Sequence, residues 1–350
     1  MRFWLAAVLV AGCYKPSLQP GSPCDDGHPC PPGLLCSAAT STCETSELDA
    51  SLVDAEPDGF ITDGCTPMPE ICGDGIDQDC NTVDPPCPPN DTATGAIDIT
   101  AGGSFTGDLT FAHDDASKPT GGSGSGFICG GSGGRDIYYK IHLVADETYY
   151  LDTFGSDFDS VIRVFHGTCA DGIAPNLTKC HNDSCATKQT QGVWDLTTGD
   201  TCVVIDQATS AEVKGSVKLR VERGHRTGSP LAGGVQTTVG TTVGGTDQSS
   251  SSCTQAGNDV GYYFTACPAE TLQVSATTCN AVTNPGFDTA LYLRRPNLAD
   301  VCNDDDPACP TSGISSTIST TASGNHLFYL IVDTSVAGTS GVFELDTNIQ

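Results

Sequence analysis

Short runs of hydrophobic residues alternate with polar residues along most of the chain, and turn-forming residues separate the runs. Alternation with a period of two marks residues 160–165 (SVIRVF), 215–221 and 341–346, as expected of strands with one buried face. Residues 326–332 (HLFYLIV) are almost continuously apolar, which is typical of a central sandwich strand. No segment of the sequence keeps a helical period of 3.6 residues over three turns. The pattern predicts an all-β protein.

The sequence after residue 91 aligns with itself, which indicates two copies of one domain. We expect one antiparallel β-sandwich over 91–224 and a second over 229–350, because two packed sheets bury the alternating faces of their strands. Four landmarks occur in the same order in both copies. They are GRDIYY at 134–139 and GNDVGYY at 257–263, DFDSVI at 157–162 and GFDTAL at 286–291, CHNDSC at 180–185 and CNDDDPAC at 302–309, and VVID at 203–206 and LIVD at 330–333.

The landmarks GxDxxY, FDT, CNDD and VVD resemble those of bacterial pre-peptidase C-terminal domains, which are β-sandwiches of about this size. The resemblance covers both copies and is better in the second. It implies non-catalytic modules that attach secreted proteins to surfaces or polysaccharide, with no active site to transfer. The first copy has Asn-Asp-Ser at 182–184 where the second has three aspartates at 304–306, so the first offers fewer carboxylates to a cation.

The N-terminus predicts export. Residues 1–12 (MRFWLAAVLVAG) form a charged start and an apolar run too short to span a bilayer, which needs about 20 residues, and are typical of a signal peptide. The sequence VAGC resembles the lipobox of bacterial lipoproteins, which implies that Cys13 is lipidated and begins a tether over 13–23. Tyr14, rather than Asp, follows it, which implies an outer-membrane address. Ordinary secretion with Cys13 in a disulfide is the alternative.

Composition supports an exported, acidic protein. The net charge of −28, from 15 basic and 43 acidic residues, excludes a basic face for nucleic-acid phosphates. Nineteen cysteines are too many for a reducing compartment, and setting Cys13 aside leaves an even number that can all pair. The cysteines expected in disulfides are Cys24, Cys30, Cys36, Cys43, Cys65, Cys72, Cys80, Cys87, Cys129, Cys169, Cys180, Cys185, Cys202, Cys253, Cys267, Cys279, Cys302 and Cys309.

The sequence leaves the disulfide connectivity open. Five cysteines fall in each repeat, and an odd number allows one bridge between the copies. In the first copy, Cys169 and Cys180 are candidate partners across a predicted loop. In the second copy, Cys302 and Cys309 flank an acidic turn.

Two small cysteine-rich modules precede the repeats. The module at 24–43 is too short to bury a core, and its cysteine gaps of five or six residues favour two disulfides over a zinc site, whose paired ligands are about two to four residues apart. The segment 44–64 carries seven carboxylates and no basic residue, which predicts a solvated linker. The second module spans 65–90.

The second module contains a candidate calcium site. Its stretch CGDGIDQDCNTVD resembles the CGDGxDxDC metal-binding repeat of myxobacterial-type surface proteins. Oxygen-bearing side chains alternate along it as in a calcium loop, although the Gly and closing Glu of an EF-hand are missing. Calcium is expected rather than a transition metal because the stretch has no His. An Asp-rich turn without an ion is the alternative. The candidate ligands are Asp74, Asp77, Asp79, Asn81 and Asp84.

The acidic turn of the second repeat is a second candidate calcium site. Like charges at adjacent positions repel, so a cation would relieve a free-energy cost. A turn that only faces water is the alternative. The candidate ligands are Asp304, Asp305 and Asp306. The aspartates expected to cap backbone amides instead are Asp159, Asp206, Asp288 and Asp333.

No motif points to catalysis or to an organic cofactor. The G-x-S-x-G match at 130–134 lies in a Gly-Ser run, without the strand and helix of a nucleophile elbow. We expect a non-catalytic lipoprotein, anchored in the outer membrane and exposed at the cell surface. Its tandem sandwiches would present binding surfaces to polysaccharide or protein ligands, and not to nucleic acid. The alternative is a structural or assembly lipoprotein that recognises another envelope protein; an enzyme comes third.

Overall fold

The structure is a computed structural model in which the chain forms two units, Met1–Asp63 and Gly64–Gln350. The signal peptide, Cys13, Cys65, Cys129 and the G-x-S-x-G match fall largely or wholly outside the described residues. No helix of the described part is long and apolar enough to cross a membrane. The described residues are 24, 30, 34–37, 41–45, 68, 70–116, 134–170, 177–210, 215–254, 256–280, 283, 287–296, 298–309 and 313–350.

In the first unit, a hairpin is held by two disulfides. Strands β1 (Leu34–Ser37) and β2 (Thr42–Thr45) pair antiparallel. Disulfides join Cys24 to Cys36 and Cys30 to Cys43. Because all four sulfurs are oxidised, this module offers no thiolate to zinc.

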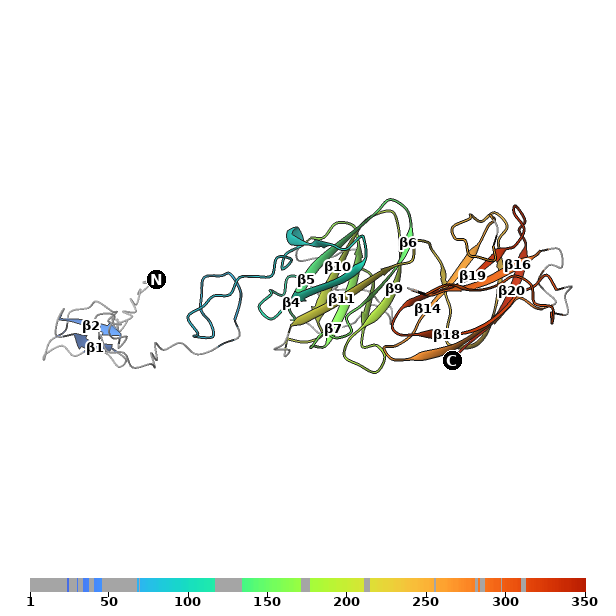
Figure 1. Ribbon diagram of the computed structural model, residues 1–350. Helices are drawn as coiled ribbons and strands as arrows, with labels where there is room; N and C mark the ends of the chain where they lie inside the picture. The colour runs from blue at the N-terminus through green and yellow to red at the C-terminus, as the bar shows by residue number, and fades with distance from the viewer. Residues whose placement is uncertain are drawn as a thin grey trace, which may run out of the picture. The chain divides into compact units, whose positions relative to one another are not determined.

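The first repeat is a sandwich of two sheets (Figure 1, cyan to yellow-green). The strand order is β3-β5-β10-β7-β8 in one sheet and β4-β11-β6-β9 in the other. A short 3₁₀ turn, η1 (Ala93–Gly95), precedes them. The strands are β3 (Ile97–Asp98), β4 (Gly103–Asp108), β5 (Asp136–Leu143), β6 (Glu147–Asp152), β7 (Ser160–His166), β8 (Leu177–Asn182), β9 (Gln191–Leu196), β10 (Gly199–Gln207) and β11 (Ser216–Arg223).

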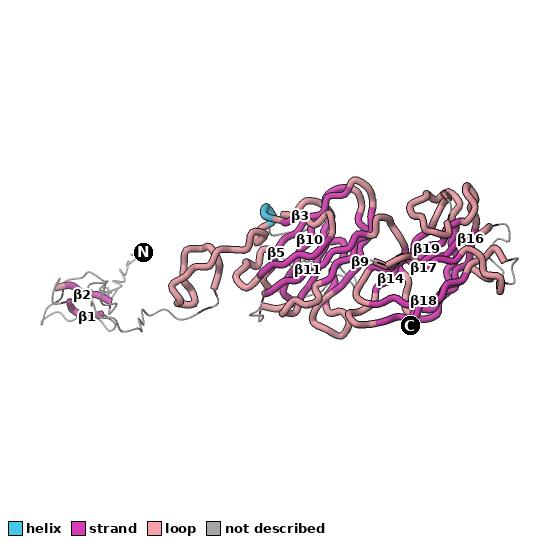
Figure 2. The backbone as a smooth tube through the Cα atoms, in the orientation of Figure 1, coloured by secondary structure: helices cyan, strands magenta, loops and turns pink. Residues whose placement is uncertain are grey.

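The second repeat has the same topology, strand for strand. In the described part of the chain, strands and loops make up both repeats, apart from the one short helical turn before the strands of the first (Figure 2). Its sheets have the orders β12-β14-β19-β16-β17 and β13-β20-β15-β18. In both repeats the short edge strand is parallel to its neighbour and the other pairs are antiparallel. The all-β sandwich prediction is confirmed. The strands are β12 (Ser229–Pro230), β13 (Gly234–Thr241), β14 (Val260–Thr265), β15 (Thr271–Thr277), β16 (Thr289–Arg294), β17 (Val301–Asn303), β18 (Thr317–Ser323), β19 (Leu327–Thr334) and β20 (Val342–Ile349).

Strand β19 is buried at every position, and the two repeats together explain why. It lies between β14 and β16 at the centre of its sheet. One set of alternate residues, Phe328, Leu330 and Val332, enters the core of the second repeat. The other set, which includes Tyr329 and Ile331, joins a cluster that contains residues of the first repeat. The run is nearly continuously apolar because both faces of the strand are buried, one in the core of the second repeat and the other in the cluster between the repeats.

That cluster joins the repeats through tyrosines. Tyr150 of the first repeat packs in it with Tyr263 and Tyr329 of the second. The Tyr263 hydroxyl also donates a hydrogen bond to Asp195 across the junction, at 3.2 Å. The connecting segment passes so close that a Cβ on Gly224 would lie 2.3 Å from the Tyr329 hydroxyl oxygen. Glycine is required there by close approach of the ring.

Charged groups and a disulfide complete the junction. Cys185 of the first repeat is bonded to Cys267 of the second. Arg220 pairs with Asp152 at 2.6 Å within the first repeat. Glu222 accepts a hydrogen bond from the backbone amide of Leu327 and contacts the His326 ring of the second repeat. The ion pairs are partly buried, so truncating one partner would leave an uncompensated charge at the junction.

The remaining disulfides differ in part from the sequence interpretation. Cys169 pairs with Cys202 rather than with Cys180, because Cys169 follows β7 and β7 lies directly beside the strand that carries Cys202. Cys180 and Cys80 are also disulfide-bonded. The other bridges are Cys72–Cys87, Cys253–Cys302 and Cys279–Cys309, so Cys302 and Cys309 have separate partners.

Each sandwich buries two aspartates on neighbouring strands. In the first repeat, Asp136 and Asp206 are partners in the β5–β10 register, and Arg163 lies 2.6 Å from Asp206. Asp136 accepts hydrogen bonds from two backbone amides through one oxygen. In the second repeat, Asp333 caps the amide of Thr334, as expected from the sequence. Asp206 instead pairs mainly with the guanidinium of Arg163.

The arginine that pairs with the buried aspartates comes from a different part of the chain in each repeat. By strand register, Tyr292 stands where the first repeat has Arg163. The cation comes instead from the connecting segment, where Arg226 lies 2.6 Å from Asp259. Arg226 and Asp259 are both almost fully buried. The connecting segment is therefore part of the second repeat's core.

Burial of these carboxyl groups makes the stability of the protein depend on pH. Burial raises the pKa of Asp136 and of Asp333 to about 7, against about 4 in an unfolded chain. Between these values the folded state keeps protons that the unfolded chain releases. The contribution of each group to the free energy of unfolding is therefore present below about pH 4 and is lost as pH rises to about 7.

We expect Asp136→Asn to abolish one part of this dependence, because the amide resembles the protonated carboxyl. Urea unfolding at pH 5 and at pH 8 gives, for wild type and for the variant, the change in unfolding free energy between the two pH values. Titrating groups that both proteins share contribute equally to the two changes and cancel when the changes are compared. The loss of stability towards pH 8 should be smaller in the variant. Equal losses would contradict the assignment.

Candidate functional site

The Asp-rich turn of the second cysteine module is folded by its own hydrogen bonds. Asp84 accepts hydrogen bonds from the backbone amides of Gly73 and Gly75, at 2.7 and 2.6 Å. Asp74 accepts from the amide of Ile76 and from the side chain of Gln78. Both glycines have positive φ, which the turn requires. Asp74 and Asp84 thus hold the loop rather than share an oxygen cluster with the other candidates.

The carboxylates that do meet are those of Asp77, Asp79 and Glu70, with oxygens within 4.8 Å of one another. Glu70 is buried and accepts hydrogen bonds from the amides of Gln78 and Asp79. Asp77 accepts from the amides of Asn81 and Thr82. The side-chain oxygen Oδ1 of Asn81 accepts a hydrogen bond from the backbone amide of Val83. The sequence analysis did not identify Glu70 as a member of this cluster. Hydrogen bonds from backbone amides stabilise the carboxylates of the cluster.

The acidic turn of the second repeat has a different donor set from the predicted one. The carboxylates of Asp304 and Asp305 lie within 4.8 Å of Asp288 rather than of Asp306. Asp306 accepts a hydrogen bond from the amide of Ala308 and so caps the turn. Asp288 was expected to cap a backbone amide. It contributes its carboxylate to this group instead, because it directly precedes β16, and β16 pairs with β17.

Two oxygens of this group lack hydrogen-bond partners. Oδ1 of Asp288 and Oδ1 of Asp304 are both buried and unpaired. Burial raises the pKa of Asp304; a hydrogen bond from the Ser335 side chain opposes this shift, and the neighbouring charges of Asp288 and Asp305 add to it. No cation contributes to that shift. Buried acceptor oxygens that lack a donor and repel one another fit a hard cation such as calcium.

The first repeat provides an internal comparison. By register, Asn182 corresponds to Asp304, and Asp159 to Asp288. Lys188 lies 3.8 Å from Asp159, whereas the corresponding position of the second repeat is Ile314. The first repeat thus has one carboxylate fewer and supplies an ammonium group of its own. The second repeat has the donors of a cation site without that lysine.

We expect millimolar calcium to raise the thermal unfolding midpoint of EDTA-treated protein, because an ion that binds only the folded state stabilises it. Asp304→Asn should abolish the rise. Asp306→Asn, a matched change two residues away, should keep it. Differential scanning fluorimetry with and without calcium makes the comparison. A rise that survives Asp304→Asn, or no rise in wild type, would refute this calcium site.

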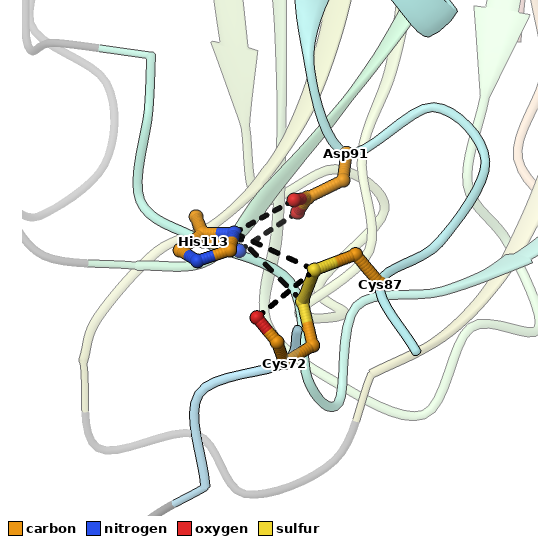
Figure 3. A group of neighbouring side chains, drawn as sticks. All are labelled: Cys72, Cys87, Asp91 and His113. Carbon is orange, nitrogen blue, oxygen red and sulfur yellow. Dashed lines mark hydrogen bonds and ion pairs between the residues drawn. A yellow bond between two sulfur atoms is a disulfide. The ribbon is translucent and has the colours of Figure 1, made fainter. Parts of the chain in front are cut away.

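A histidine joins the second cysteine module to the first repeat (Figure 3). His113 Nδ1 lies 2.7 Å from the buried carboxylate of Asp91, which raises the pKa of the imidazole. The same nitrogen lies 3.8 Å from both sulfurs of the Cys72–Cys87 disulfide. Since those sulfurs are bonded to each other, they are not thiolate ligands. A further bond from the Arg135 guanidinium to the carbonyl of Glu70 fixes the module.

A groove between the two repeats is a candidate site for a larger ligand. This inter-repeat groove has a volume of about 560 Å³ and is lined by both repeats. The Cys185–Cys267 disulfide lies in its wall. Burial lowers the pKa of His181 to about 4, so that side chain is neutral at pH 7. Other lining residues include Lys179, Gln191, Tyr263, Phe264 and Glu270.

Comparison with known proteins gives only remote likenesses. No protein-family model and no curated protein matches the sequence. The pre-peptidase C-terminal domain of a Bacillus anthracis collagenase is 12% identical, covers 35% of this chain and 95% of its own, and has a TM-score of 0.23. The CUB1-EGF-CUB2 region of human MASP-1/3 is 9% identical, with coverages of 71% and 99% and a TM-score of 0.18. Tandem CBM51 modules of a Streptococcus pneumoniae family 98 glycoside hydrolase are 9% identical, with coverages of 64% and 83% and a TM-score of 0.19.

Proposed function

We propose that this chain is a non-catalytic binding protein that holds a polysaccharide or protein ligand in the inter-repeat groove. The observation that carries the proposal is that both walls of the groove are fixed to each other. A disulfide, Cys185–Cys267, and the charged junction hold the repeats in one arrangement. Because the groove is already formed, the walls need not become ordered when a ligand binds, and binding loses less conformational entropy.

The chemistry of the groove suits a polar, largely uncharged ligand. His181 is neutral, and Gln191, Tyr263 and Phe264 also line the groove. Apolar walls with a few fixed polar groups are typical of sites that bind small molecules and sugars. Lys179 and Glu270 add one charge of each sign. We therefore favour polysaccharide over a charged partner for this groove.

The buried titratable groups support a non-catalytic role. Strongly shifted carboxyl groups often mark active sites. Here the pKa values of Asp136, Asp206 and Asp333 are raised by burial, yet all three lie on the central strands of the sandwiches and none lines the groove. Their role is to pair with cations and amides inside the fold.

Lipidation of Cys13 would attach the protein to the outer membrane, with the acidic linker as spacer. Support for this part comes from the VAGC sequence and the signal-peptide pattern. We expect the mature N-terminal peptide to carry acyl chains on Cys13, and Cys13→Ala to release the protein from membranes. Mass spectrometry and fractionation test this; an unmodified mature Cys13 would contradict it.

Blocking the groove tests the binding function. Gly233 lines the groove without positive φ, and a Cβ there would meet only a carbonyl oxygen at 3.7 Å. Gly233→Trp should therefore fill the groove without straining the backbone. Val235→Trp, on an 80% exposed side chain two residues later, is the matched control.

Retention on insoluble cellulose, chitin and cell-envelope polysaccharide, measured by pull-down, should fall at least about tenfold for Gly233→Trp and stay unchanged for Val235→Trp. Equal retention of the two variants would refute the groove as the site. Failure of wild type to bind any polysaccharide, with capture of an envelope protein instead, would favour the alternative of an assembly lipoprotein.

A further inference from the structure

Positive charge is scarce in the second repeat and is concentrated at one place. Residues 229–350 contain two basic residues, Arg294 and Arg295, against eleven acidic ones. Both arginines line a cavity of about 370 Å³ together with Arg223 and His225, which come from the end of the first repeat. We call this cavity the arginine pocket. Its lining shares no residue with that of the inter-repeat groove.

Two of the three guanidinium groups already have carboxylate partners. Arg223 forms a two-point contact with Glu147, at 3.0 and 2.6 Å. Arg294 lies 3.3 Å from Asp300 and also donates to the backbone carbonyl of Ser250. These contacts fix the directions of the two side chains. The pairing neutralises them. Glu222 also lines the pocket and pairs with Arg220 at 2.6 Å, so Arg295 is the charged side chain of the lining without an ion-pair partner among the described residues.

Arg295 is the exception among the arginines of the pocket. One of its terminal nitrogens donates to the carbonyl of Ala299 at 2.7 Å. Its Nε is buried and has no hydrogen-bond partner, and no carboxylate of the described residues forms an ion pair with it. A buried donor without an acceptor is costly, more so when it carries charge. An oxyanion bound to the guanidinium group would supply the opposite charge that the described residues do not.

We infer that the arginine pocket binds the carboxylate or sulfate group of an anionic saccharide; the saccharide part of this inference rests on the proposed function. The planar guanidinium matches the two oxygens of such a group. Pro296, Leu327 and Tyr329 form the apolar part of the walls. The chain has a net charge of −28 and so repels anions over most of its surface, whereas this pocket presents the guanidinium group of Arg295.

The test uses the whole purified protein and three oligosaccharide probes: oligogalacturonate, a sulfated galactan fragment and neutral galactan. Isothermal titration should show binding of at least one anionic probe. Arg295→Gln should weaken it at least about tenfold, whereas Arg295→Lys, which keeps the charge but loses the planar fork, should lie between. Lys218→Gln, a matched loss of one exposed positive charge, should bind as wild type does. The ratio of the two anionic affinities distinguishes carboxylate from sulfate.

Inorganic sulfate separates failure of this inference from failure of the proposed function. A thermal shift by sulfate that is larger in wild type than in Arg295→Gln, without binding of any saccharide, would retain the anion site and refute a saccharide ligand. Binding of poly-L-glutamate but no saccharide would do the same. Equal anionic binding by wild type and Arg295→Gln, with circular dichroism showing both folded, would overturn the site. Binding of neutral galactan that Arg295→Gln weakens as strongly as it weakens binding of the anionic probes would overturn the ligand class.

Discussion

The organisation of the binding surfaces depends on the outer face of strand β19 in the second repeat. Tyr329 and Ile331 on that face are buried because Tyr150 and neighbouring residues of the first repeat cover them. A sandwich on its own would expose this apolar face to water, at roughly 25 cal/mol per Å² of apolar surface. Covering it brings the ends of both repeats together, and Cys185–Cys267 fixes that arrangement covalently. The inter-repeat groove and the arginine pocket both arise from this junction.

The two repeats keep one topology while their polar residues have diverged. Arg163 neutralises the buried aspartates of the first repeat, whereas Arg226 of the connecting segment does so in the second. Lys188 lies beside Asp159 in the first repeat, and the second has an isoleucine at the corresponding position. The sheets keep the same strand order despite these replacements, one of which, Arg163 to Tyr292, lies within a strand. The replacements leave the second repeat with the carboxylates of a candidate cation site that the first repeat lacks.

The sequence was informative where the signal is local and periodic. The duplicated landmarks and the alternating strands predict two sandwiches, and the apolar run that includes Leu330 predicts a central strand. Pairings set by register were not accessible: Cys169 bonds to Cys202 because two strands lie side by side. The acidic groups show the same limit. Glu70 and Asp288 enter their clusters from segments outside the acidic motifs, and a contact between distant segments has no signature in one sequence.

The central claim is that the two repeats form one unit with fixed binding surfaces, and its direct test is calorimetry of the intact, oxidised protein. If the junction couples the sandwiches, both repeats unfold in one transition whose calorimetric enthalpy equals its van't Hoff enthalpy. Two separate transitions, each with the enthalpy of one sandwich, would contradict the claim, because the groove and the arginine pocket would then lie between domains that are energetically independent.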